Sequence, residues 1–96
     1  MSQVNHPEHY NVKGKKECIV EMSERFGVLA VLFFCVLNTY KYLYRADYKE
    51  SKDQDENKAR WYIKYAQDLL SKNRVTAFIC SIFFPRILKY IKETNV

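Results

Sequence analysis

Apolar side chains recur at helical spacing through most of the chain. Their pattern predicts a short first helix from about residue 15 to Gly27, because a glycine commonly ends a helix. A second, longer helix is expected from residue 28 to about 48, and its first half is apolar on every side, as in a helix surrounded by neighbours. Its apolar run, 28–37, spans ten residues, whereas a membrane span needs about 20. We interpret this run as a buried core segment.

The middle of the chain is rich in charge. Residues 47–60 carry acidic and basic side chains in nearly equal number, which is typical of a solvated connector running into the first turn of a helix. Asp53 or Asp55 suits the N-cap of this third helix, because a carboxylate there accepts backbone N–H bonds and favours the helix dipole. The helix is expected to be amphipathic, with Asn73 as its terminator.

The two ends of the chain differ in pattern. Residues 74–93 are helical in pattern but contain Pro85, which predicts a kink or a break into two short helices. Residues 1–14 lack helical periodicity and are expected to form an ordered arm. The expectation is one all-α domain of about four helices, with the arm at 1–14, a helical core at 15–72 and a hydrophobic, basic C-terminal helix at 73–96.

Composition narrows the function classes. The 96 residues include only two glycines, which disfavours the glycine-rich loops that cradle phosphates in common kinases. The net charge of +5 favours a polyanionic or nucleotide partner. Most of the excess charge follows residue 68, where cations alternate with large apolar side chains. One small core can hardly cover so many Phe, Tyr and Ile residues, so we expect a homo-oligomer, with the C-terminal helix as its interface in preference to a membrane-surface helix.

The cysteines indicate a reducing compartment. Cys18, Cys35 and Cys80 form no CxxC pair, and two of them lie in apolar runs where a small hydrophobic residue would serve equally well. The start of the chain does not resemble a secretory signal, so the cytoplasm is the expected location.

One stripe of polar side chains stands out on the second helix. It falls at offsets 0, 3, 4, 7 and 11, which places its members on one helix face: Asn38, Lys41, Tyr42, Arg45 and Lys49. An amide, a guanidinium, a phenol and two ammonium groups at such intervals are donors that phosphate oxygens accept well. A solvated polar face is the alternative. Asn38 argues against it, because an amide among apolar neighbours needs a hydrogen-bond partner.

Other candidate residues have weaker patterns. His6 and His9 are spaced for a metal pair, but zinc needs further ligands, so histidines that pin the arm or contact a nucleotide are the stronger alternatives. Lys58 and Trp61 open the third helix. Trp61 is either a core or interface residue, or a platform that stacks a nucleobase beside the cations.

Carboxylates offer a further alternative. Glu17 and Glu21, with acidic residues of 53–56, are spaced for a magnesium cluster, but the doubled acidic motifs of helical nucleotide hydrolases are missing. A solvated face is the preferred interpretation. No P-loop motif and no Ser-His-Asp spacing is present in the sequence.

Three segments carry a resemblance to a known family. They are VNHPEHY at 4–10, NTYKYLYRA at 38–46 and KARWYI at 58–63. Together they resemble the SaV-like small phage proteins, long catalogued as a domain of unknown function. The resemblance covers residues 4–63 and implies a tailed-phage origin and a small helical protein. The family includes a nucleotide kinase without a P-loop and a relative linked to sensitivity to an abortive-infection system.

The chain shares a set of polar residues with the family pattern. It departs from that pattern at positions next to them. The shared residues are Asn5, His6, His9, Tyr10, Asn38, Lys41, Tyr42, Arg45, Lys49, Asp55, Lys58 and Trp61. Leu37 stands where the family often has Gly, Asp47 and Tyr48 replace small residues, and Gln54 with Asp55 replaces a Glu-Asp pair. Losing an acidic group there argues against metal-assisted phosphoryl transfer.

The resulting expectation is a phage accessory protein that binds a nucleotide or cyclic oligonucleotide without a cofactor. It would sequester an immune signal in the cytoplasm of the infected bacterium. The expected ligand-binding residues are Asn5, His6, His9, Tyr10, Asn38, Lys41, Tyr42, Arg45, Lys49, Lys58 and Trp61. One alternative is a nucleoside monophosphate kinase with Mg²⁺ held by Asp55 or Glu17. The other is an antagonist that binds a bacterial defence or replication protein.

Overall fold

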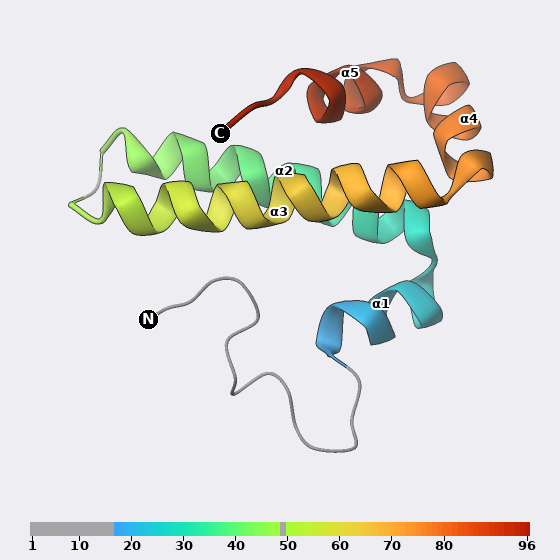
Figure 1. Ribbon diagram of the computed structural model, residues 1–96, viewed down its shortest axis with the longest axis horizontal. Coiled ribbons are helices and arrows are strands. Elements are labelled where there is room, and N and C mark those ends of the chain that lie inside the picture. The colour runs from blue at the N-terminus through green and yellow to red at the C-terminus, as the bar shows by residue number, and fades with distance from the viewer. Residues whose placement is uncertain (1–16, 49) are drawn as a thin grey trace.

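The computed structural model describes residues 17–48 and 50–96, and these form five α-helices without a strand (Figure 1). The all-α expectation is confirmed. The helices are α1 (Cys18–Phe26), α2 (Val28–Ala46), α3 (Lys52–Lys72), α4 (Arg74–Phe83) and α5 (Pro85–Glu93). The predicted break at Pro85 is complete: Phe84 takes a non-helical φ of −135° and ψ of 56°, and Pro85 starts α5 at a position where no N–H is needed. The break raises the count from four helices to five.

Helices α2 and α3 run side by side as the central pair, with α1 on one side and α5 on the other (Figure 1). Leu32 and Cys35 of α2 and Ala66 of α3 are fully buried between them. Ile19 of α1 and Ile91 of α5 extend the same core from the two sides. The two outer helices thus attach to the central pair through apolar contacts.

Gly27 forms the corner between α1 and α2. Its φ of 96° and ψ of 156° lie in a region that residues with a Cβ rarely adopt. Gly27 N–H donates to the carbonyl of Ser23 at 2.9 Å, which closes the last turn of α1. The predicted stop at Gly27 is confirmed, whereas the predicted start near residue 15 lies outside the described residues.

Helix α3 begins earlier than the sequence pattern predicts. Ser51 is its N-cap residue, and Asp53 and Asp55 lie within its first turn. The prediction that one of these aspartates is the N-cap is therefore wrong, although a carboxylate in the first turn still favours the helix dipole. The backbone N–H of Asp55 donates to the carbonyl of Ser51 at 3.0 Å, so the charged stretch is already helical here.

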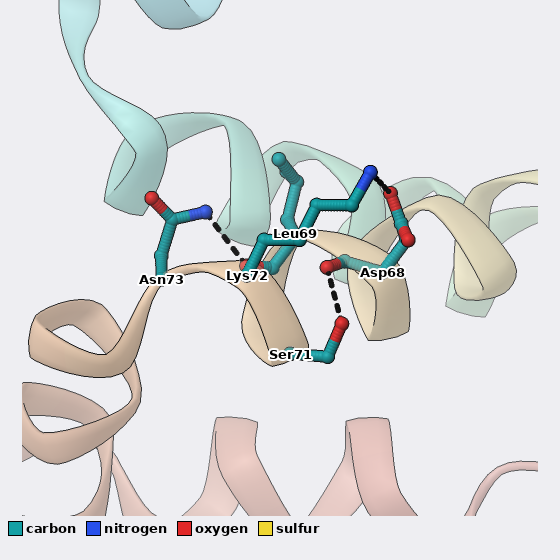
Figure 2. Close-up of polar contacts among 5 residues, drawn as sticks. All are labelled: Asp68, Leu69, Ser71, Lys72 and Asn73. Atoms are coloured by element: carbon teal, nitrogen blue, oxygen red, sulfur yellow. Dashed lines mark hydrogen bonds and ion pairs between the residues drawn. The ribbon is translucent and has the colours of Figure 1, made fainter.

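Side chains close the other end of α3 (Figure 2). Asn73 takes a non-helical φ of −126° and donates its Nδ2 to the carbonyl of Leu69 at 2.7 Å. Lys72 pairs with Asp68 at 3.1 Å, and the Ser71 hydroxyl donates to the Asp68 carbonyl at 2.8 Å. The Asn73 contact satisfies the Leu69 carbonyl, which is one of the last four of α3 that lack an intrahelical partner. The predicted terminator role of Asn73 is confirmed.

Helix α5 returns along the central pair and is held by hydrogen bonds from α3. Gln67 Nε2 donates to the carbonyls of Ile91 at 3.0 Å and Thr94 at 3.3 Å. Arg60 Nε donates to the carbonyl of Val96 at 3.2 Å. Two long α3 side chains thereby bind the last turn of α5 and the residues after it.

The apolar first half of α2 is covered on one face only. Val31, Leu32 and Cys35 are buried, but Phe34 is 37% and Leu37 is 65% exposed. The interpretation of 28–37 as a wholly buried segment is therefore wrong for its outer face. Within the described residues, no helix has the length and apolarity that a membrane span requires.

Candidate functional site

Three cationic side chains lie close to the aromatic ring of Tyr42 on α2. Lys41 Nζ is 4.4 Å from the centre of the Tyr42 ring, Lys58 Nζ is 5.3 Å from it, and Arg45 Cζ is 5.5 Å from it. Distances below about 6 Å allow each cation to interact with the ring electrons. We call Lys41, Tyr42, Arg45, Asp55 and Lys58 the Tyr42 cluster.

The antiparallel packing of α2 and α3 assembles the cluster. Lys41, Tyr42 and Arg45 fall within one turn near the end of α2, and Lys58 comes from the first half of α3. The Tyr42 ring stacks on Tyr62 of α3, with ring centres 6.0 Å apart and planes at 8°. Tyr62 is held in turn by an edge contact with Phe34 at 5.7 Å. The ring that gathers the cations is therefore fixed by aromatic packing.

Asp55 is the buried acidic member of the cluster. The residue is 1% exposed, and its Oδ2 atom accepts no hydrogen bond from the residues that the structure describes. Arg45 Nε lies 3.9 Å from that oxygen, an ion-pair distance that is too long for a hydrogen bond. A buried charge normally needs both a partner and hydrogen bonds. Asp55 is thus a buried carboxylate that pairs with Arg45 without a hydrogen bond at Oδ2.

The charge pattern predicted that Asp55 lies in a solvated connector, and this prediction is wrong. A signal for its burial was available in the helix period. Asp55 shares one face of α3 with Ala59, Ile63 and Ala66, which are all buried. A carboxylate on the apolar face of an amphipathic helix indicates a special environment, and Asp55 belongs with the site residues for that reason.

The cluster has the electrostatics of an anion site. It brings three cations to one ring, and one of them, Arg45, pairs with the buried carboxylate of Asp55. Lys41 is exposed, and Arg45 and Lys58 are partly exposed. Like charges held near one another repel, and an anion bound among them lowers that repulsion. Guanidinium and ammonium groups are the usual donors to phosphate oxygens.

Two predicted site residues have structural roles. Asn38 is half-buried, so the prediction that it is buried is wrong, and its Nδ2 donates to the carbonyl of Phe34 at 2.9 Å in its own helix. Its expected contact with a ligand stays a prediction. Trp61 packs against the hydrophobic core and stacks on Tyr65, with ring centres 5.2 Å apart. The core alternative describes Trp61 better than the base-stacking one.

The remaining predicted ligand-binding residues lie outside the described part of the chain. They are Asn5, His6, His9, Tyr10 and Lys49. Their expected roles stay predictions.

The structure does not unite the carboxylates suggested for magnesium. Burial raises the pKa of Tyr65, and the charge of nearby Glu17 adds to this effect. Tyr65 follows Asp55 by ten residues on α3, a distance of about 15 Å along the helix axis. Glu17 therefore lies near a different part of α3 from Asp55. In residues 17–48 and 50–96, no three His, Cys, Asp or Glu side chains gather where they could hold a metal ion.

A family model described as a protein of unknown function (DUF3310) matches residues 4–64. The chain belongs to the DUF3310 family. The DUF3310 match contains every residue of the Tyr42 cluster and ends within α3, so α4 and α5 lie outside it. Searches of curated proteins and of solved structures found no match. The candidate site therefore belongs to the family portion of this DUF3310 protein.

Proposed function

We propose that this DUF3310 protein binds a phosphorylated ligand, a nucleotide or a nucleotide-like molecule, at the Tyr42 cluster. One observation carries the proposal: three cations from two helices converge within 5.5 Å of the centre of a single ring. A phosphate group bound there would accept hydrogen bonds from Lys41, Arg45 and Lys58. It would also offset the repulsion among them.

The nucleotide character of the ligand rests on the sequence resemblance. The SaV-like phage proteins include a nucleotide kinase, and the three segments that carry the resemblance contain Lys41, Tyr42, Arg45 and Lys58. We infer a phage accessory protein that acts in the cytoplasm of the host bacterium. By holding a mono-, di- or cyclic oligonucleotide, it would withdraw an immune signal from the host defence.

Titration calorimetry at fixed salt tests the binding proposal. Mononucleotides, dinucleotides, cyclic oligonucleotides and inorganic phosphate are titrated into the wild-type protein and into Arg45→Met and Lys58→Met. Each substitution should weaken binding by about tenfold or more, as expected for loss of one charge-assisted contact. Lys89→Met on α5 is the matched control, because it removes one exposed cation outside the cluster. Absence of binding to the wild-type protein would refute the proposal, as would equal weakening by the control.

A kinase is the second candidate, and the convergence of three cations on the Tyr42 ring favours it. In a nucleoside monophosphate kinase, the cations would stabilise the transferring phosphoryl group and Asp55 would hold Mg²⁺. The assay is turnover of ATP with dTMP or dGMP in the presence of Mg²⁺. Asp55→Asn separates the candidates: it should abolish turnover in a kinase, but raise phosphate affinity in a binding protein because a local negative charge is removed.

Antagonism of a host protein is the third candidate, and the exposed aromatic side chains favour it. Phe83 is 70% exposed at the end of α4, and Tyr90 of α5 is half-buried and contacts the exposed Tyr40 with ring centres 6.4 Å apart. An antagonist acting through this surface would keep its activity in Arg45→Ala. It would lose activity when Phe83 or Tyr90 is changed to a charged residue. The reverse pattern in a phage-defence assay supports action through the Tyr42 cluster.

A further inference from the structure

The outer face of α2 carries a row of large exposed side chains. Leu37 is 65% exposed, Tyr40 61%, Tyr44 56% and Tyr48 69%. Their spacing of three, four and four residues places them on one side of the helix, extended into the turn that follows it. We call these four residues the α2 outer stripe. They lie on a different face from the buried Leu32 and its neighbours.

The α2 outer stripe is ordered and uncharged. Tyr40 stacks on Tyr44 with ring centres 6.5 Å apart, and Tyr44 makes an edge contact with Tyr48 at 5.1 Å. Phe33 lies one turn before Leu37, so positions 33, 37, 40 and 44 alternate in steps of four, three and four. That is the spacing of a helix seam that packs against another helix. Phe33 is half-buried and makes an edge contact with Phe84 at 4.9 Å, and Tyr40 contacts Tyr90 of α5. Leu37, Tyr40 and Tyr44 nevertheless keep more than half of their surface exposed.

We propose that a second copy of this chain covers the α2 outer stripe, so that α2 helices from two copies pack against each other. The stripe has no charged member, so it can face its own copy without bringing like charges into the contact. Lys41 neighbours Leu37 and Tyr44 on the helix surface and would lie at the rim of the contact.

The exposed area supports a pair of copies. At the exposed fractions given above, the four side chains leave roughly 500 Å² uncovered, which is more than a scattered surface residue accounts for. A stable interface needs about 800 Å² per partner. Phe33 and Tyr90 border the stripe, since Phe33 precedes Leu37 by one turn and Tyr90 contacts Tyr40. Two copies packed along α2 would therefore bury about 1,000 Å² in total, which is at the lower limit for a specific interface and below the standard size.

The other large apolar surface fits a second copy less well. Val75, Phe78 and Ile82 are exposed on α4, but Arg74 and Arg86 flank this surface at its two ends. Pairing the α4 surface with itself would bring two cations of each copy toward the other copy, whereas the α2 outer stripe has one, Lys41, at its rim. Sequence reasoning expected the interface at 73–96, and the uncharged stripe on α2 is the better candidate.

Light scattering after gel filtration tests the inference, which does not rest on nucleotide binding. The wild-type protein should have twice the chain mass of 11.5 kDa. Leu37→Glu and Tyr44→Glu should each halve that mass while circular dichroism shows unchanged helix content. Phe78→Glu is the matched control on α4 and should keep the mass of the pair. A wild-type protein at 11.5 kDa at every concentration would overturn the inference.

Cross-linking gives a second readout that does not depend on a disruptive substitution. Tyr40 lies near the middle of the stripe, so a cysteine there meets its own copy whether the two α2 helices run parallel or antiparallel. In a Cys18→Ser background, Tyr40→Cys should form an intermolecular disulfide on mild oxidation, and Phe78→Cys should not. A cross-link at Phe78→Cys without one at Tyr40→Cys would place the interface on α4 and refute the proposal.

Discussion

The contact between Arg45 and Asp55 should contribute measurably to stability even though Arg45 is partly exposed. Two unit charges about 4 Å apart interact by about 4 kcal/mol at an effective dielectric constant of 20. The Arg45 side chain is 41% exposed, so solvent screening reduces this to about 1–2 kcal/mol. Arg45→Met leaves the buried carboxylate without its cation and should lower the free energy of unfolding by about 2 kcal/mol, less than for a fully buried pair.

A double-mutant cycle isolates the interaction. Urea unfolding, followed by circular dichroism and Trp61 fluorescence, is measured for the wild-type protein, Arg45→Met, Asp55→Asn and the double variant. The double variant should be more stable than the sum of the single effects predicts, with a coupling of about 1–2 kcal/mol. Lys41→Met is the control, because it removes a cation from the same ring while leaving the contact between Arg45 and Asp55 in place.

The outcome that would refute this reasoning is specific. A coupling energy within about 0.3 kcal/mol of zero would mean that solvent screens the contact completely. Equal coupling of Lys41→Met and Arg45→Met to Asp55→Asn would mean that Asp55 responds to the general positive field and not to Arg45 in particular.

Three further predictions concern the core and the α1–α2 corner. Burial raises the pKa of the Cys35 thiol from 9.0 to about 12. The thiol of the unfolded chain therefore loses its proton at a lower pH than the thiol of the folded chain. The resulting contribution to the free energy of unfolding is complete below pH 9 and is lost as pH rises toward 12. Between pH 8 and pH 10, the free energy of unfolding measured in urea should fall by about 1.4 kcal/mol more in the wild-type protein than in Cys35→Ala. An equal fall in both proteins would contradict this prediction. Gly27→Ala should lower the free energy of unfolding by about 1–3 kcal/mol. Backbone strain alone causes this loss, because an added Cβ at Gly27 would meet no atom within 4 Å. An unchanged denaturation midpoint would show that the backbone at this corner relaxes to accept alanine. Leu32→Ala should cost about 2–5 kcal/mol in the same assay, whereas Val75→Ala, at a site 74% exposed, should change stability by less than about 0.5 kcal/mol.

The helical fold was largely predictable because local signals agree with one another. Gly27, Asn73 and Pro85 mark three of the helix boundaries, and each acts through its own backbone or side-chain chemistry. The start of α3 was missed because the charged stretch around Asp53 lacks large apolar side chains. This stretch is helical here because it continues directly into the amphipathic part of α3, and that part packs along α2.

The candidate site was predictable in part. Helical spacing alone places Lys41, Tyr42 and Arg45 on one face of α2. The meeting with Lys58 depends on the register between α2 and α3, which no spacing within one helix reveals. The intrahelical bond of Asn38 was not predicted, because an amide on a helix can bond either the carbonyl one turn earlier or a group outside the helix.

The hydrogen bonds from α3 to α5 suggest an order in which the helices pack during folding. Helices α2 and α3 follow each other closely along the chain, so bringing them together requires closing only a short loop. Arg60 and Gln67 instead reach carbonyls 36 and 24 residues away. We expect the α2–α3 hairpin to form first and α5 to dock last, and amide hydrogens of α5 to exchange with solvent faster than those of α2.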